Sequence, residues 1–211
     1  MTPAGLRVLR FRALGSETGL DVRLRTVVLP GIARMPGVLE AWAGRRRTLD
    51  DAAERCLAAV VAIDDPLVAS LGEPPELRRL DPSLPVVEAV TSQVLPVAVA
   101  VIGDRPDPPR VLRVVDGSVR SDELPRYVRE VEAGARADVM ARHGPLRLYL
   151  AVQEPDRFLT ISTWADWGDI QASTGSDARH PSVTRHVELL RSADVAHFEL
   201  LPDDVPAAVA T

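Results

Sequence analysis

The chain has 211 residues, of which 46% are hydrophobic and 26% charged, and its formal net charge at pH 7 is −5. These proportions resemble those of soluble globular proteins, so the chain can build a packed core and disorder is not indicated for its bulk. Every basic residue is arginine, and the arginines are spread along the chain instead of gathered in one arm. Together with the negative net charge, this distribution argues against a nucleic-acid partner.

The sequence shows no targeting or membrane-spanning segment. Arginines at positions 7, 10 and 12 interrupt the first apolar run, and no uncharged stretch of about 18 residues occurs. The single cysteine, Cys56, cannot form an internal disulfide and lies in an apolar segment typical of a buried strand. A cytoplasmic protein without a membrane partner is therefore expected.

Short internal similarities indicate two copies of one unit. The matching segments are residues 7–10 with 110–113, 69–72 with 172–175, and 94–96 with 200–202. The first two pairs have the same separation, which unrelated matches would rarely share. The predicted organisation is an N-terminal half at 5–102, a Gly- and Pro-rich linker at 103–109, a C-terminal half at 110–202 and a frayed tail at 203–211.

Periodicity gives the first unit the order β-α-β-β-α-β. Its predicted elements are a strand at 6–13, a helix at 16–34, strands at 38–43 and 55–63, a helix at 66–71 and a strand at 87–95. Thr18 and Asp21 have the spacing of a capping box at the first helix. The arginine-rich segment 44–54 is expected to lie in solvent.

The second unit repeats this order with one extra helix. Its predicted elements are a strand at 110–115, a helix at 122–142, strands at 146–152 and 158–164, helices at 166–173 and 181–191, and a strand at 194–201. Ser121 is the expected N-cap of the long helix and Gly144 its C′ residue. An apolar stripe would lay that helix on a sheet; it comprises Leu124, Val128, Val131, Ala135 and Val139. Both units thus predict an α+β protein.

The second unit resembles a known family in its last elements. These are the segment 158–164, which ends in Ser162-Thr163-Trp164, then 166–175, 180–190 and 195–200. They resemble the antibiotic-biosynthesis-monooxygenase-like branch of the dimeric α+β barrel superfamily, well over 108–202 and weakly over 5–96. The resemblance implies two tandem ferredoxin-like units whose sheets close into one pseudo-dimeric α+β barrel. Such a chain would be a monomeric pseudo-dimer or a homodimer of it.

Strand alternation in the second unit predicts a ligand pocket. Phe158, Thr160, Ser162 and Trp164 share one face of their strand. We assign this face to the barrel interior, because its mixture of aromatic and hydroxyl groups suits a small ligand. The matching positions of the first unit, Leu57, Ala59 and Val61, are apolar. The single pocket is therefore expected in the C-terminal half, and the N-terminal half is expected to be a degenerate, structural partner.

The resemblance implies chemistry without metal, flavin or other cofactor. Family members oxidise aromatic polyketides by letting the deprotonated substrate donate an electron to oxygen. In this chain Trp164 would stack on the aromatic substrate, while His180, Arg185 and His186 would handle protons and charge. Plain packing is the alternative for Trp164, and a solvated surface position for His186. The family carries Asn four residues before the Trp, where this chain has Thr160.

Other chemistries find less support in the sequence. His180 and His186 are six residues apart, a poor spacing for two metal ligands on one helix face, and no metal site is predicted. Arg10 and Arg113 are interpreted as equivalent positions paired by carboxylates across the two halves, and Arg113 is also a candidate substrate-binding residue. The functional hypothesis is a monooxygenase-like protein acting on or binding a small aromatic or quinone-like molecule. Its alternative is a non-catalytic barrel used for ligand binding or assembly.

Overall fold

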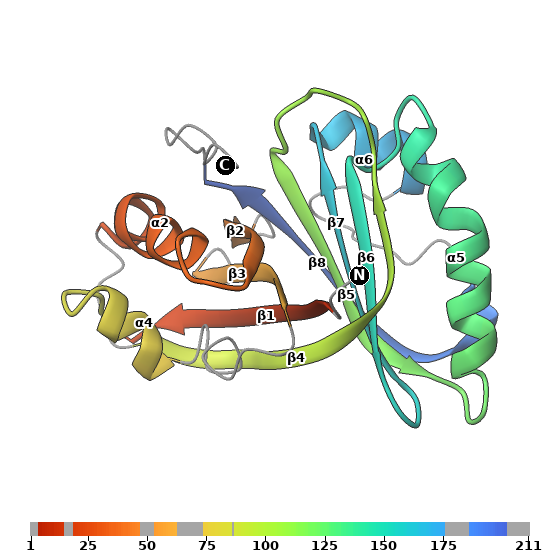
Figure 1. Ribbon diagram of the computed structural model, residues 1–211, viewed down its shortest axis with the longest axis horizontal. Helices are drawn as coiled ribbons and strands as arrows, with labels where there is room; N and C mark the ends of the chain where they lie inside the picture. Colours follow the sequence, from red (N-terminus) through yellow and green to blue (C-terminus); the bar gives the residue numbers. More distant parts are fainter. Residues whose placement is uncertain are drawn as a thin grey trace.

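The structure is a computed structural model that describes residues 4–14, 19–46, 53–62, 74–85, 87–175 and 186–201. Its strands form one closed antiparallel barrel in the order β1-β3-β2-β8-β5-β7-β6-β4. Helices pack against the outside of this barrel, with α2 and α4 around one half and α5 and α6 around the other (Figure 1). Among the described helices, none has the length and apolar character needed to cross a bilayer.

The first part of the chain forms four strands and their helices. The elements are β1 (Ala4–Ala13), α1 (Leu20–Arg23), the π-helical segment η1 (Leu24–Val28), α2 (Leu29–Ala33), β2 (Val38–Arg46), β3 (Glu54–Ala62), α4 (Pro74–Leu80) and β4 (Val87–Ile102). Residues 103–110 contain neither helix nor strand and lead into the second part.

The second part of the chain supplies the other four strands. The elements are β5 (Val111–Val119), α5 (Leu124–Met140), β6 (Arg147–Gln153), β7 (Arg157–Trp164), α6 (Trp167–Thr174), the 3-10 turn η2 (Val187–Leu189) and β8 (Leu190–Leu200).

The predicted α+β class is confirmed, whereas the division into paired ferredoxin-like sheets is not. Within the barrel the strand order is β4-β1-β3-β2 in one half and β8-β5-β7-β6 in the other. The edge strands do not stay within their halves, because β4 pairs with β6 and β2 pairs with β8. All eight strands therefore belong to one closed sheet, and its closure satisfies the backbone groups that open edges would expose.

Of the four apolar clusters in the described part of the chain, the three largest make up most of the core. The barrel interior is filled by side chains from every strand, among them Leu6, Cys56, Leu112, Ile161 and Phe198. A second cluster lies between the outer face of the first half and its helices, and a third between the outer face of the second half and α5. The predicted burial of Cys56 is confirmed, and burial raises the pKa of its thiol.

Several predicted boundaries are wrong, because strand pairing decides them. The strand predicted at 87–95 continues to Ile102 through pairing with β6, and the predicted solvent segment 44–54 begins as strand where Gly44 lies opposite Leu200. The C-terminal end of the predicted helix 181–191 is also strand, because Leu190 begins β8. The helix predicted at 66–71 and Thr18 lie outside the described residues, whereas α4 was not predicted.

The caps of the long helix α5 also differ from prediction. Its N-cap is Glu123 instead of Ser121, and the helix ends at Met140, so Gly144 is not its C′ residue. The predicted apolar stripe is present, because its members are buried or partly buried against the sheet.

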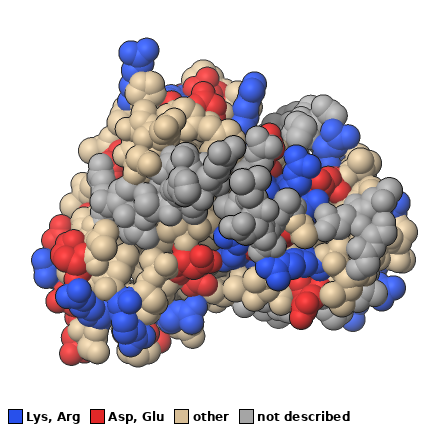
Figure 2. Space-filling view, turned by 180° about the vertical axis from the view of Figure 1, so that it is seen from behind, with Lys and Arg blue, Asp and Glu red and all other residues tan. Residues whose placement is uncertain are grey.

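Ion pairs join the two halves, as was predicted for Arg10. Its Nη1 lies 2.5 Å from Asp194 Oδ2 on β8, and its Nε donates to Glu54 on β3. Arg147 on β6 lies 3.0 Å from Glu40 on β2. Arginine and acidic side chains are interspersed over the face of the molecule that Figure 2 presents. The junction between the halves is therefore polar at its surface and apolar in its interior.

Asp81 connects helix α1 to the segment after α4, and its contribution to stability is expected to depend on pH. Its carboxylate accepts hydrogen bonds from Arg23 Nε at 2.5 Å, Arg23 Nη2 at 2.6 Å and Ser83 Oγ at 2.7 Å. The bonds from Arg23, together with those from Ser83, outweigh desolvation and hold the pKa of Asp81 well below its usual value. A lowered carboxyl pKa stabilises the fold above the unfolded-state pKa of about 3.9, and this contribution is lost as pH falls.

We expect Asp81→Asn to lower the free energy of unfolding by about 1 kcal/mol at pH 7, a small effect because solvent screens the half-exposed Arg23. The loss should shrink at pH 2.5, because this pH lies below the unfolded-state pKa of about 3.9, where protonation of Asp81 in the unfolded chain removes part of its contribution to stability. Urea denaturation at both pH values measures the difference. An equal loss at pH 7 and pH 2.5 would contradict the assignment.

Candidate functional site

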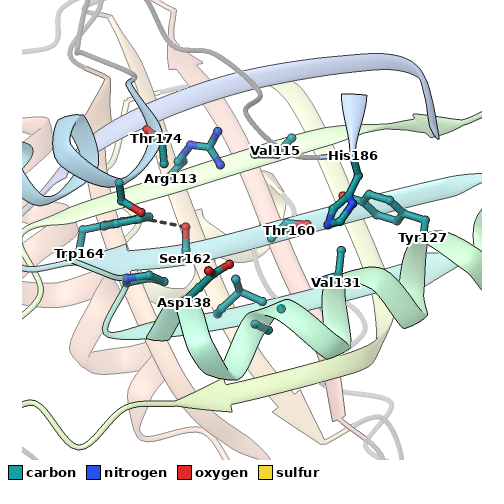
Figure 3. Close-up of a pocket in the computed structure, with 15 residues that line it drawn as sticks. Arg113, Val115, Tyr127, Val131, Asp138, Thr160, Ser162, Trp164, Thr174 and His186 are labelled. Carbon is teal, nitrogen blue, oxygen red and sulfur yellow. Dashed lines mark hydrogen bonds between the residues drawn. The ribbon is translucent and has the colours of Figure 1, made fainter. Parts of the chain in front are cut away.

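A cavity of about 120 Å³ lies between the outer face of the second half and helix α5. Strands β5 and β7 form one wall and α5 forms the other (Figure 3). The polar and aromatic side chains of its lining include Arg113, Tyr127, Asp138, Thr160, Ser162, Trp164 and His186. Aliphatic side chains, including Val131 and Leu148, complete the lining. The cavity thus combines a polar sheet wall with a largely apolar helix wall.

The predicted face of β7 is correct in composition but wrong in direction. Thr160, Ser162 and Trp164 do share one face, yet it points outward to α5, while Leu159 and Ile161 fill the barrel interior. Buried aliphatic and aromatic side chains from all eight strands form one cluster inside the barrel. The cavity beside Thr160, Ser162 and Trp164 therefore lies outside the barrel, where α5 crosses the sheet.

Trp164 is fixed at one end of the cavity. Its Nε1 donates to Ser162 Oγ at 2.9 Å, and its ring packs with Val111, Ile170 and Trp167. The indole therefore both packs in the core and presents a surface to the cavity. Ser162 accepts from Trp164, so its own hydrogen remains available as a donor.

Tyr127 and His186 form the other end of the cavity, as Figure 3 shows. Burial raises the pKa of Tyr127 to about 12, although its hydrogen bond with Thr160 and the charge of Arg113 act in the opposite direction. Tyr127 is thus a neutral phenol at physiological pH. The His186 ring meets the Tyr127 ring edge-on at 6.2 Å between centroids. His186 also has a left-handed backbone with φ 56°, a conformation that costs non-glycine residues energy and often occurs at functional sites.

Arg113 brings a cation to the sheet wall. Desolvation lowers the pKa of Arg113 to about 10, so the guanidinium remains charged at neutral pH. The predicted equivalence of Arg113 with Arg10 is wrong, because the two side chains lie on opposite faces of the sheet. Arg10 pairs in register with Cys56, which faces the barrel interior, whereas Arg113 pairs with Ser162, which faces the cavity.

Arg7 is the structural counterpart of Arg113 in the first half. It pairs in register with Ala59 and lies beneath Leu29 and Ile32 of α2. The space beside it is only about 10 Å³, because Leu57 and Ala59 occupy the positions that hold Thr160 and Ser162 in the second half. Of the two spaces beside these equivalent arginines, the larger one therefore lies under α5 in the second half.

Helix α6 closes the cavity near Trp164, because its Ser173 and Thr174 belong to the lining. Asp166 caps the helix by accepting from the backbone nitrogen of Asp169 at 2.9 Å. Asp169 in turn accepts from Arg105 at 2.8 Å and lies 2.8 Å from His143 Nδ1. Burial acts to raise the pKa of Asp169, but these partners outweigh it and lower the pKa. The linker and the end of α5 thus hold α6 in place.

The predicted site residues are only partly brought together. Arg113, Thr160, Ser162, Trp164 and His186 line the cavity, whereas His180 and Arg185 lie outside the described residues. Phe158 does not line the cavity; it is buried beneath Tyr127, with ring centroids 4.8 Å apart. Within the described residues, no group of His, Cys, Asp or Glu is arranged to hold a metal ion.

Sequence reasoning missed Tyr127 and Asp138 on the helix wall. Both lie on the apolar face of α5, since Tyr127, Val131 and Asp138 follow one another at helical spacing. A polar residue interrupting an apolar stripe was the available signal.

The sequence matches no protein-family model, and no curated protein matches it by sequence. Solved structures are similar in fold over almost the whole chain. A "putative monooxygenase" from Fusobacterium nucleatum has a TM-score of 0.69 and 12% identity, covering 95% of this chain and 94% of its own. A "putative monooxygenase" from Lactobacillus acidophilus has a TM-score of 0.66 and 10% identity, covering 95% of each chain. An "anthrone oxidase-like protein" has a TM-score of 0.57 and 11% identity, covering 97% of each chain.

Proposed function

We propose that this protein is a cofactor-independent monooxygenase that acts on a small aromatic or quinone-like molecule in the cavity under α5. The observation that carries the proposal is the cavity itself, which places a neutral phenol, two hydroxyl groups and an indole around one space. The names of the structures with a similar fold include monooxygenase and anthrone oxidase-like, which supports oxidation of an aromatic substrate.

We also propose that the two halves of the chain arose by duplication of one β-α-β-β-α-β unit. Their strand orders, β4-β1-β3-β2 and β8-β5-β7-β6, support this origin. After duplication, the small apolar side chains at Leu57 and Ala59 removed the space under the first helix. The C-terminal half alone then keeps a site.

The proposed reaction balances with molecular oxygen as the oxidant. A hydroquinone loses a proton, and the resulting anion transfers one electron to O2. The radical pair combines to form a carbon–oxygen bond at a ring carbon, and loss of water then gives a hydroxyquinone. One oxygen atom enters the product and the other leaves in water, so hydroquinone and O2 give hydroxyquinone and H2O.

The residues have separate roles in this scheme. His186 accepts the substrate proton, and His180 and Arg185 are further candidates for moving protons and charge in the same half. Tyr127 is a neutral phenol and donates a hydrogen bond to the oxyanion that develops on the ring. Trp164 and the Ser162 hydroxyl orient the ring.

Oxygen consumption tests the proposal. A panel of hydroquinones, naphthols and anthrones should include a substrate that the purified protein oxidises, and Trp164→Phe should abolish the reaction. His186→Gln should lower the rate by about 100-fold, the typical contribution of a general base. Trp42→Phe is the matched control, because Trp42 belongs to the cluster inside the barrel and should leave the rate unchanged.

Two results would contradict the proposal. A blank across the panel would favour the non-catalytic barrel that binds a ligand. Absorption bands of flavin or haem in the purified active protein would show that the reaction depends on a cofactor.

A further inference from the structure

The size of the cavity under α5 restricts what it can hold. Its volume is about 120 Å³. An engineered apolar cavity of about 150 Å³ in another protein binds one benzene ring, so a single ring is the largest aromatic unit expected here. Val131 and Leu148 are among the apolar side chains that line this space.

The charges on the cavity walls indicate which single ring would bind. Arg113 lies on the sheet wall, and its burial has removed part of the hydration of the guanidinium. A guanidinium in this state gains most from a planar carboxylate, which accepts two parallel hydrogen bonds from it. Asp138 belongs to the helix wall of the cavity (Figure 3), and because its carboxylate would repel an acid group, a ligand carboxylate must lie on the sheet wall against Arg113.

The other end of the cavity is suited to a hydroxyl group. Figure 3 places Arg113 beside Trp164 and Ser162, while Tyr127 and His186 lie beyond Thr160 at the opposite end. Tyr127 and Thr160 are hydrogen-bonded to each other, and each hydroxyl can both donate and accept. A ring with an acid group at one end and a hydroxyl group at the other would satisfy both ends.

We propose that the cavity binds a single-ring hydroxylated aromatic acid, with its carboxylate on Arg113 and its hydroxyl group between Tyr127 and His186. This inference rests on the proposed function, because it assigns the substrate class of the same site. It goes beyond that function because it requires a negative charge on the ligand and excludes ligands with fused rings.

Calorimetric binding under nitrogen tests charge and size separately. 4-Hydroxybenzoate should bind, and the neutral 4-hydroxybenzamide should bind at least about tenfold more weakly because it lacks the charge that Arg113 recognises. 6-Hydroxy-2-naphthoate should not bind to the native protein, but should bind to Leu148→Ala, because the smaller side chain enlarges the cavity. Because the comparison of acid with amide uses the native protein, it does not depend on the folding of a variant.

Arg113→Gln should remove the preference for the acid over the amide, whereas Arg7→Gln should keep it. Arg7 is the matched control, since it occupies the corresponding strand position beside a space of only about 10 Å³. Circular dichroism establishes that both variants fold. Equal binding of acid and amide, tight binding of the naphthoate to the native protein, or the same effect from both arginine variants would each overturn the inference.

The two proposals fail in different ways. Binding of 4-hydroxybenzoate without oxygen consumption on 2,5-dihydroxybenzoate or any member of the panel would refute the monooxygenase and keep the ligand class. Oxygen consumption with anthrones or naphthols alone would keep the monooxygenase and refute the single-ring acid.

Discussion

Replacing Glu54 with leucine is expected to lower the free energy of unfolding by about 3–5 kcal/mol, the usual cost of removing one partner from a buried ion pair. The Glu54 side chain is 0% exposed, and its carboxylate accepts hydrogen bonds from Arg10 and from Arg46 Nη1 at 2.5 Å. Without Glu54, the Arg10 guanidinium stays in a site that is only 6% exposed and keeps Asp194 as its carboxylate partner. Guanidinium denaturation followed by circular dichroism measures the loss.

Two further variants separate the cost of an uncompensated charge from the loss of a favourable contact. The double variant Arg10→Met, Glu54→Leu should recover part of the stability, because an apolar pair avoids burying an unbalanced charge. Arg126→Ala removes an exposed pair with Glu123 on α5 and should change stability by no more than about 0.5 kcal/mol. A double variant as unstable as Glu54→Leu would contradict the explanation.

Gly117→Ala is expected to cost about 2–3 kcal/mol and also to weaken ligand binding. Gly117 lies in β5 between Phe158 on β7 and Ala193 on β8. An added Cβ would lie 2.3 Å from the carbonyl oxygen of Ser192 and 3.0 Å from the Phe158 ring. Because the Ser192 oxygen belongs to the backbone, the strand itself must move.

The effect on binding follows from the position of Phe158. Its ring supports Tyr127, so a displaced Phe158 shifts the phenol at the end of the cavity. Thermal denaturation and calorimetric binding of 4-hydroxybenzoate measure the two effects. Gly168→Ala is the control, because its Cβ would meet only the flexible side chain of Asp166, at 3.1 Å, and its effect should stay within about 1 kcal/mol. An equal loss in both variants would show that the strand tolerates the added methyl group.

Local periodicity predicted most elements of the second half, because their signals depend on a few neighbouring residues. The alternation over 158–164 and the apolar stripe of α5 both correspond to observed elements. Prediction was poorer where a partner strand sets the boundary. The extension of β4 to Ile102 depends on β6, which follows it by many residues in the chain.

The candidate site was predicted in part for the same reason. Thr160, Ser162 and Trp164 were grouped correctly, because residues two apart on a strand share a face. Tyr127 was missed, because only the docking of α5 brings its phenol to Thr160. The sequence around Arg113 resembles that around Arg10, but this resemblance does not determine where the Arg113 side chain points. Arg113 faces the cavity because it pairs in register with Ser162.

The sequence by itself determined the α+β class, the alternating faces of β7 and the placement of polar side chains in the second half, since each follows from residues close together in the chain. Only the tertiary structure decided which face of β7 looks toward the ligand space. Side chains from all eight strands fill the interior of the closed sheet. The cavity lies outside the barrel, between the sheet and helix α5. Alternation separates two faces of a strand, but only packing against the rest of the chain determines which face meets the barrel and which meets the helix.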